Sequence, residues 1–188
     1  MRPAILLSAA LASVVLAGTI DRVAIVIDKQ VITESEVETA LRLTEFLNEK
    51  PLDLSAAARR AEADHMVDQE LLRRELDASG FAKPAESQAD TLLRSFRQQR
   101  FRSTADYRAA LARYGITEEE LKERLLWQVT ALHFTDFRFG STLAADTTQS
   151  ADRAAPGAPV QTVDQRMDTW LKDTRKDTKI TFKPEAFQ

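Results

Sequence analysis

The chain has 188 residues, a net charge of −3, 29% charged and 44% hydrophobic residues, and no cysteine. This length and composition are typical of one soluble globular domain, or of one domain with a short appendage. The slightly acidic balance argues against nucleic acid as a partner, and the lack of cysteine excludes disulfides and thiol chemistry.

Residues 1–18 have the pattern of a secretory signal peptide. Arg2 gives a positive start, residues 4–16 are apolar, and the small residues Ala17 and Gly18 suit a cleavage point. The apolar run is short for a membrane span, so we expect export to the periplasm without stable membrane insertion after cleavage. An uncleaved N-terminal anchor is the alternative interpretation.

The next segment predicts a β-hairpin. Residues 23–27, VAIVI, have the alternation of a strand, and Val31 and Ile32 follow a polar turn. A two-stranded ribbon is marginal by itself, so it needs a further strand or helices from elsewhere in the chain. Near the C-terminus, Ile180 and Phe182 alternate again. We therefore expect a C-terminal strand that pairs with the hairpin.

Cap and stop residues predict five helices between the hairpin and Gly140. Thr33 with Glu36 forms a capping box that opens the first helix. The later boundaries are as follows: a second helix from Ser55 to about Ser79 with Gly80 as its stop, a third with Pro84 in its first turn, a fourth from Ser103 to Gly115, and a fifth from Thr117 through residue 139.

The composition changes after residue 140 and changes back near residue 160. Residues 141–159 are rich in Ala, Ser, Thr, Asp, Pro and Gly, which is typical of a linker. Helical periodicity returns at Val163, Met167 and Trp170. The predicted organisation is therefore a signal peptide (1–18), a helical region (19–140), a linker (141–159), and a helix and strand (160–188) that complete the same domain. The predicted fold class is mainly α with a small β-sheet.

The sequence contains no recognisable catalytic motif. It lacks a P-loop, a dinucleotide-binding glycine fingerprint and a G-x-S-x-G elbow. His65 and His133 lie on different predicted helices, and neither has a second residue at metal-ligand spacing. We predict no catalytic residue, no cofactor and no metal site.

Four segments resemble the chaperone module of the SurA family of periplasmic chaperones. They are VAIVIDKQVITESEVETAL, AEADHMVDQELLRRELDASGF, YGITEEELKERLLWQV and MDTWLKDTRKDTKITF, and they occur in the family's order. The resemblance implies an ATP-independent chaperone, or holdase, whose partners are unfolded polypeptides, above all outer-membrane protein precursors in transit.

The family's parvulin prolyl-isomerase domains have no counterpart here. Such a domain needs roughly a hundred residues, and the stretch between the fifth helix and the C-terminal helix is only residues 141–159. The resemblance therefore supports a chaperone and argues against an isomerase. Two alternatives stay open: a peptidyl-prolyl isomerase of the same family, and an envelope interaction module that does not act as a chaperone.

A holdase needs apolar surface that an extended client can reach. Candidate client-binding residues are the aromatics that a single helical stripe explains least, although core packing is the alternative for each. These residues are Phe101, Tyr107, Tyr114, Trp127, Phe134, Phe137 and Phe139.

Overall fold

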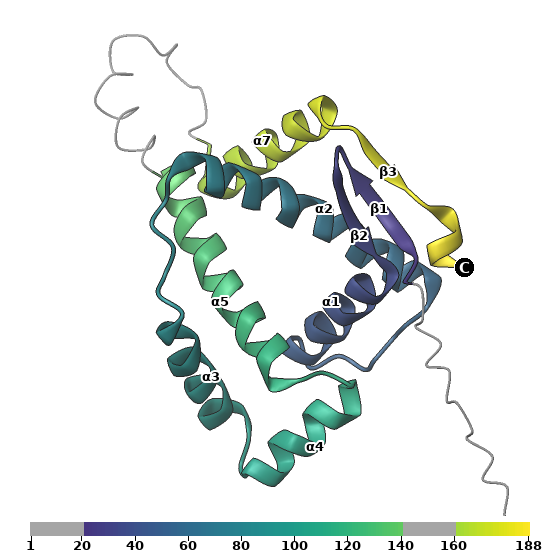
Figure 1. The fold of residues 1–188 in the computed structure, drawn as a ribbon. Helices are drawn as coiled ribbons and strands as arrows, with labels where there is room; N and C mark the ends of the chain where they lie inside the picture. The colour runs from purple at the N-terminus through teal and green to yellow at the C-terminus, as the bar shows by residue number, and fades with distance from the viewer. Residues whose placement is uncertain (1–20, 141–160) are drawn as a thin grey trace, which may run out of the picture.

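The computed structural model describes residues 21–140 and 161–188 (Figure 1). The predicted signal peptide and the predicted linker lie outside these residues. The predicted fold class is confirmed, because the described chain is mainly helical with one small antiparallel sheet. The helices are α1 Glu34–Leu47, α2 Ala56–Ser79, α3 Ser87–Arg100, α4 Thr104–Tyr114, α5 Glu118–Thr135 and α7 Val163–Asp177, with the short turns η1 Asp136–Gly140 and η2 Pro184–Phe187. The strands are β1 Val23–Ile27, β2 Gln30–Thr33 and β3 Ile180–Phe182.

The sheet joins the two ends of the described chain. Its strand order is β2-β1-β3, so the C-terminal strand pairs with the N-terminal hairpin as predicted. Ile25 lies opposite Ile32 on one side and Phe182 on the other. Ile25 and Ile27 are fully buried against residues of α1 and α2. The hairpin is thus stabilised by a third strand and by helices, which a two-stranded ribbon requires.

Asp28 at the hairpin turn fixes the position of the third strand. Its φ is +54°, a left-handed conformation that Asp tolerates better than most residues. Its backbone N–H donates to the Lys179 carbonyl at 2.9 Å, and its carboxylate accepts from the Lys179 N–H at 3.1 Å. Arg74 of α2 donates to the Asp28 carboxylate and to the Ile27 carbonyl, both at 2.8 Å. One residue therefore ties the hairpin to β3 and to α2.

Most predicted helix boundaries are confirmed. Complete capping boxes open α1 at Thr33 and α5 at Thr117, and the Ser55 hydroxyl caps α2. The predicted position of Pro84 in the first turn of the third helix is wrong. The chain first makes a tight turn, in which the Gln88 N–H donates to the Ala85 carbonyl at 2.9 Å, and α3 begins only at Ser87.

The fifth helix also differs from the prediction at its end. The α-helix stops at Thr135, and residues 136–140 continue as a π-helical turn. The wider turn changes which side chains face inward: Phe139 is buried, whereas Phe137 is 56% exposed. The apolar periodicity of the sequence does not predict this change from α-helix to π-helix.

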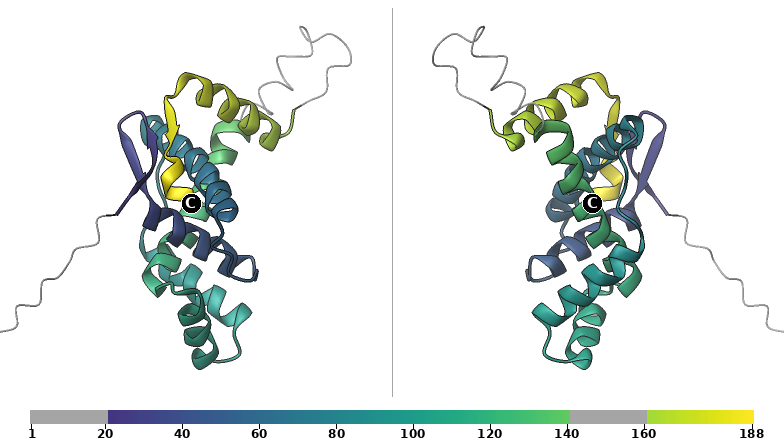
Figure 2. Two further views of the ribbon diagram at one scale, coloured as in Figure 1. Left: turned by 90° about the vertical axis from the view of Figure 1, so that its right-hand side faces the viewer. Right: turned by 90° about the vertical axis from the view of Figure 1, so that its left-hand side faces the viewer.

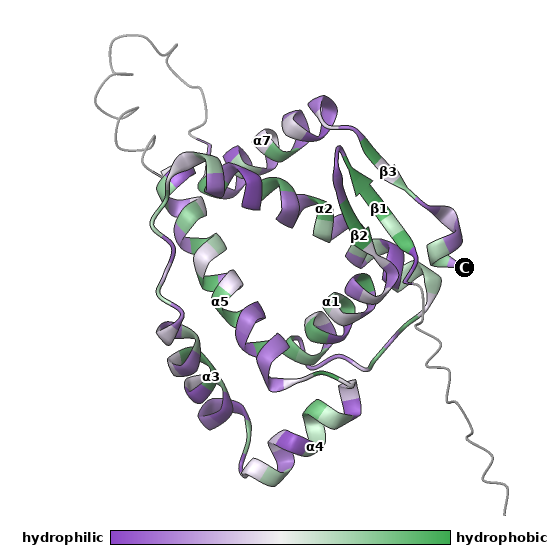
Figure 3. Ribbon diagram, in the orientation of Figure 1, coloured by the Kyte–Doolittle hydropathy of each residue, from purple (hydrophilic) through white to green (hydrophobic). Residues whose placement is uncertain are grey.

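Three apolar clusters hold together the part of the chain that the structure describes. One lies between the sheet, α1 and α2; a second joins α1, α3, α4 and α5; and a third joins α2 and α5, with Trp170 of α7 packed against it. Two further views place α3 and α4 at one end of the molecule and α7 at the other (Figure 2). Apolar residues concentrate in β1 and β3, while α3 is largely hydrophilic (Figure 3).

A polar network crosses the junction of α1, α2 and α5. Arg124 donates to Gln69 at 3.0 Å and to the Thr44 hydroxyl at 3.1 Å, and Thr44 donates to the Glu62 carboxylate at 3.0 Å. The Glu62 side chain is 3% exposed and lies 3.9 Å from the Arg124 guanidinium. Burial lowers the pKa of Arg124, and the charge of Glu62 opposes that shift. The network fixes α5 to the pair of helices that carries the sheet.

Candidate functional site

Three hollows that share lining residues lie along β2, α2, α5 and the segment that leads into α3. The first, about 300 Å³, is lined by Val31 and Ile32 of β2 and by Met66 and Gln69 of α2, with Arg73 at its end. The second, about 320 Å³, lies beyond Arg73 and includes Pro84, Leu126, Trp127 and Thr130. The third, about 200 Å³, shares Glu86, Glu123 and Leu126 with the second and continues to Ala89 and Lys122. We call this series of hollows the groove.

Trp127 and Arg73 stand at the middle of the groove. The Arg73 guanidinium lies 4.3 Å from the centre of the Trp127 ring, within cation–π range. Trp127 is half-buried and packs at the edge of the third apolar cluster, while Arg73 is exposed. The indole therefore packs against the cluster and is also contacted by the exposed Arg73 side chain.

One end of the groove lies along an open strand. β2 is an outer strand of the sheet, with β1 on one side only. Val31 on β2 is 41% exposed and lines the first hollow together with Met66. The outer edge of such a strand carries backbone N–H and C=O groups that an extended polypeptide can pair with. The groove thus offers backbone hydrogen bonds at β2 and an aromatic surface at Trp127.

The structure does not bring the seven predicted client-binding residues together. Trp127 alone among them lines the groove. Tyr107, Phe134 and Phe139 are at most 5% exposed and belong to the interior. Phe137 is exposed and packs against Phe81 and Phe134, with ring centres 5.3 and 6.5 Å apart.

The two remaining candidates, Phe101 and Tyr114, surround Phe46. Their ring centres lie 6.1 and 5.4 Å from that of Phe46, and the Tyr114 hydroxyl donates to the Lys50 carbonyl at 2.6 Å. Both rings thus pack in the second apolar cluster. Five of the seven residues therefore lie in the core or at its border, Trp127 lines the groove, and Phe137 is exposed.

Most residues of the groove carry no signal in the sequence that would assign them to a binding site. The positions of Met66, Leu126 and Arg73 in the groove could not be predicted. Helical periodicity identifies the buried face of a helix, but not the neighbouring element against which that face packs. The pairing of Arg73 with Trp127 spans two helices, and no local motif signals it. The proximity of an outer strand to α2 follows only from the folded topology.

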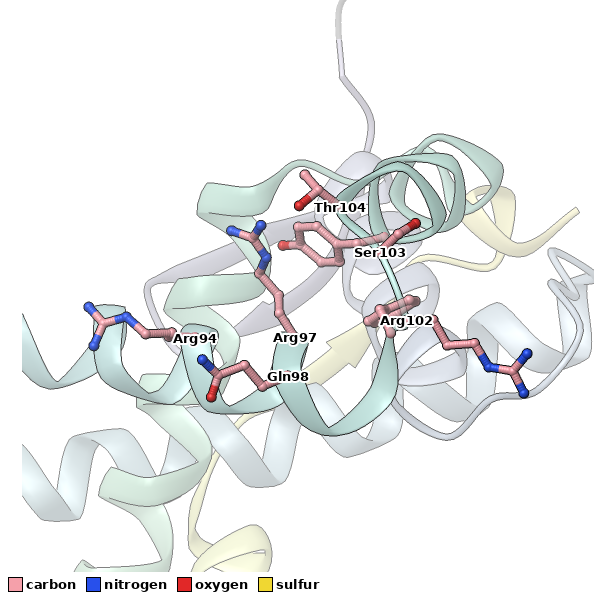
Figure 4. Close-up of a pocket in the computed structure, with 8 residues that line it drawn as sticks. Arg94, Arg97, Gln98, Arg102, Ser103 and Thr104 are labelled. Atoms are coloured by element: carbon pink, nitrogen blue, oxygen red, sulfur yellow. The ribbon is translucent and has the colours of Figure 1, made fainter.

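A separate hollow of about 340 Å³, outside the groove, lies between α3 and the start of α4 (Figure 4). We call it the arginine pocket, because Arg94, Arg97 and Arg102 line it together with Ser103, Thr104 and Tyr107. Arg97 turns toward the start of α4, whereas the guanidinium groups of Arg94 and Arg102 extend to either side (Figure 4). Within the described chain, Arg94 and Arg102 take part in no hydrogen bond or ion pair.

Tyr107 forms the inner wall of the arginine pocket. Its side chain is 1% exposed, and the Arg97 guanidinium lies 4.7 Å from its ring centre. Burial raises the pKa of this phenol, and the nearby Glu118 carboxylate raises it further. However, no acceptor among the described residues, Glu118 included, meets the distance and angle of a hydrogen bond to its hydroxyl. A buried donor without an acceptor is uncommon and costly.

His65 and His133 are both exposed, on α2 and α5. The residues with assigned positions contain no group of three or more His, Cys, Asp or Glu side chains that could hold a metal ion. None of the described helices combines the length and the apolar character needed to cross a membrane.

Comparison of the sequence with known proteins gave no match, either to a protein-family model or to a curated protein. The site must therefore be interpreted from its own geometry and chemistry.

Proposed function

We propose that this protein is a periplasmic, ATP-independent chaperone that holds unfolded polypeptides, with outer-membrane protein precursors as its clients. The observation that carries the proposal is the groove itself, in which hollows run from the outer strand β2 past Met66 to Trp127 and the exposed Arg73. The resemblance of four segments to the SurA chaperone module, and the predicted signal peptide, support the same function and the periplasmic location.

The lining of the groove suits an extended chain of mixed polarity. It contains both apolar residues, such as Ile32, Met66 and Leu126, and charged ones such as Glu70 and Arg73. A strand of an outer-membrane barrel has the same mixture, because apolar and polar side chains alternate along it and aromatics gather near its ends. Such a strand can place aromatic side chains at Trp127 and polar ones toward the charged rim.

Weak binding is sufficient for this task. A holdase stabilises the unfolded client by mass action and thereby lowers the concentration that can aggregate. The hollows are open to solvent and share walls, so a client can leave without ATP. The exposed Arg73 side chain can cover Trp127 again when the client departs.

The proposal is tested by light scattering from an unfolded outer-membrane barrel diluted out of denaturant. A molar excess of the protein should slow its aggregation. The variant Arg73→Glu, which puts a negative charge beside Glu70 and Glu123, should lose much of this effect. Arg108→Glu, an equal charge reversal at an exposed position of α4, should keep it. Unchanged aggregation in the presence of the wild-type protein would refute chaperone function.

Client contact can be measured separately in a Trp170→Phe background, which leaves Trp127 as the one tryptophan. Adding a peptide with the alternating pattern of a barrel strand should shift Trp127 emission in a saturable way. If the wild-type protein slows aggregation but Trp127 emission stays constant, clients bind elsewhere and the groove is not their site.

A further inference from the structure

The arginine pocket has features that neither the proposed chaperone function nor the packing of the core requires. Arg94 and Arg102 take part in no ion pair within the described chain, and the Arg97 guanidinium lies 3.8 Å from the Glu118 carboxylate, which is a long ion pair. Unpaired arginines at one end of a helix pair are the side chains that bind oxyanions best, because the guanidinium presents several donors in a fixed fork.

The start of α4 adds backbone donors to the same pocket. The first N–H groups of a helix have no intrahelical acceptor and carry partial positive charge. Ser103 uses its hydroxyl to cap the Asp106 N–H at 3.1 Å and to donate to the Asp106 carboxylate at 2.8 Å. That carboxylate offsets part of the positive charge, but the N–H groups of Thr104 and Ala105 precede the capped one.

The buried hydroxyl of Tyr107 is the independent sign of a ligand. The Tyr107 side chain lines the pocket, and its hydroxyl oxygen is inaccessible to water and has no acceptor among the described residues. Leaving such a group unsatisfied in a buried position costs free energy that a bound acceptor would recover. A phosphate oxygen accepts hydrogen bonds from a phenol, from guanidinium groups and from backbone N–H groups alike.

We propose that the arginine pocket binds a phosphate-type oxyanion, held by Arg97 and Arg102, by the start of α4 and by the Tyr107 hydroxyl. Arg102 is exposed, so its guanidinium can swing over the anion from the position that it has in Figure 4. The phosphate can belong to a soluble compound or to a lipid headgroup, because the pocket opens at the surface and recognises the same group in either.

The first experiment titrates inorganic phosphate into the ¹⁵N-labelled protein, with sodium chloride at matched ionic strength as reference. The amide signals of Thr104, Ala105 and Tyr107 should shift and saturate, with a dissociation constant of about 1 mM or lower. Shifts that stay linear, or that chloride reproduces, would overturn the proposal.

Variants separate binding from structure. Arg97→Gln should weaken phosphate binding about tenfold or more, and Tyr107→Phe about threefold or more, since both remove a donor. Arg113→Gln removes an exposed arginine at the other end of α4 and should leave the affinity unchanged. Equal affinities in all these variants would overturn the proposal.

Glu118→Gln distinguishes ligand binding from a merely structural ion pair. It removes the carboxylate that competes for Arg97 while keeping the arginine, so phosphate should bind as tightly or more tightly. If Arg97 served only to hold α3 against α5, Glu118→Gln and Arg97→Gln would weaken the phosphate response alike.

The source of the phosphate is assigned with lipid vesicles. Co-sedimentation with phosphatidylglycerol vesicles but not with phosphatidylcholine vesicles, abolished by Arg97→Gln and reduced by free phosphate, would assign the headgroup. Saturable phosphate binding without co-sedimentation would assign a soluble phosphate compound. Because this pocket is separate from the groove, loss of phosphate binding should leave the suppression of client aggregation unchanged.

Discussion

Glu62 and Arg124 form a largely buried ion pair. We expect that replacing either residue alone destabilises the protein, whereas replacing both does not. The Glu62 side chain is 3% exposed and that of Arg124 is 16% exposed, so either charge left alone would be largely removed from water. Breaking a buried pair costs about 3–5 kcal/mol, whereas replacing both partners with apolar residues is often neutral or stabilising. We expect a cost at the lower end of this range, because the two charged groups are 3.9 Å apart and Arg124 also has hydrogen bonds to Gln69 and Thr44.

We therefore expect Glu62→Met alone and Arg124→Met alone each to lower the free energy of unfolding by about 3 kcal/mol. The corresponding drop in melting temperature is about 6–12 °C for a chain of this size. The double variant should lie within about 1 kcal/mol of the wild type. Urea unfolding, followed by tryptophan fluorescence and circular dichroism, measures all four proteins.

Comparison of the single and double variants shows whether the two side chains interact. A double variant that loses the sum of the two single losses would mean that the side chains act independently. Single variants that each lose less than about 1 kcal/mol would mean that water reaches the site and screens both charges. Either result would refute the view that this network fixes α5 to α1 and α2.

Three further predictions concern the sheet and a helix end. The Lys179 N–H and the Arg74 guanidinium lower the pKa of Asp28. The stabilising contribution of its carboxylate is therefore present above the ordinary pKa of 3.8 and is lost as the pH falls below that value. In thermal melts between pH 5 and pH 3, Asp28→Asn should lose less stability than the wild type. Phe182→Ala removes a half-buried ring that lies 3.3 Å from the Arg60 guanidinium and should cost about 2 kcal/mol in urea unfolding; a loss near zero would mean that β3 contributes little. Gly115→Ala should cost about 1 kcal/mol in the same assay, because φ is +65° and the new Cβ would lie 3.0 Å from Arg42 Nη1; an unchanged midpoint would contradict this strain.

Local chemistry allowed much of the fold to be predicted. Thr33 and Thr117 carry their capping boxes within four residues of sequence, and Gly80 marks the end of α2 with a left-handed φ of +69°. The pairing of Ile180 and Phe182 with the hairpin followed from a physical requirement, since the ribbon needed a further strand. The caps and the glycine stop depend on residues that are close in sequence, and the third strand follows from the unpaired edge of the predicted hairpin. Both kinds of feature can be identified from the sequence.

The parts that could not be predicted depend on contacts across helices. Phe46 stands at the centre of an aromatic cluster whose other members, Phe96, Phe101 and Tyr114, lie outside its own helix. The polar residues Glu62 and Arg124 are buried because they meet one another, and a single sequence contains no sign of that meeting. The contact between Arg73 and Trp127 also joins two helices, so neither it nor the groove could be predicted from the sequence.

Hydrogen exchange with and without an unfolded outer-membrane barrel client tests the central claim most directly. If clients occupy the groove, backbone amides of β2, of α2 near Met66 and Arg73, and of α5 near Trp127 should exchange more slowly in the complex. Amides of α7 and of the last turn of α4 should keep their rates. Protection confined to other elements, or no protection at a client concentration at which aggregation is suppressed, would contradict the account.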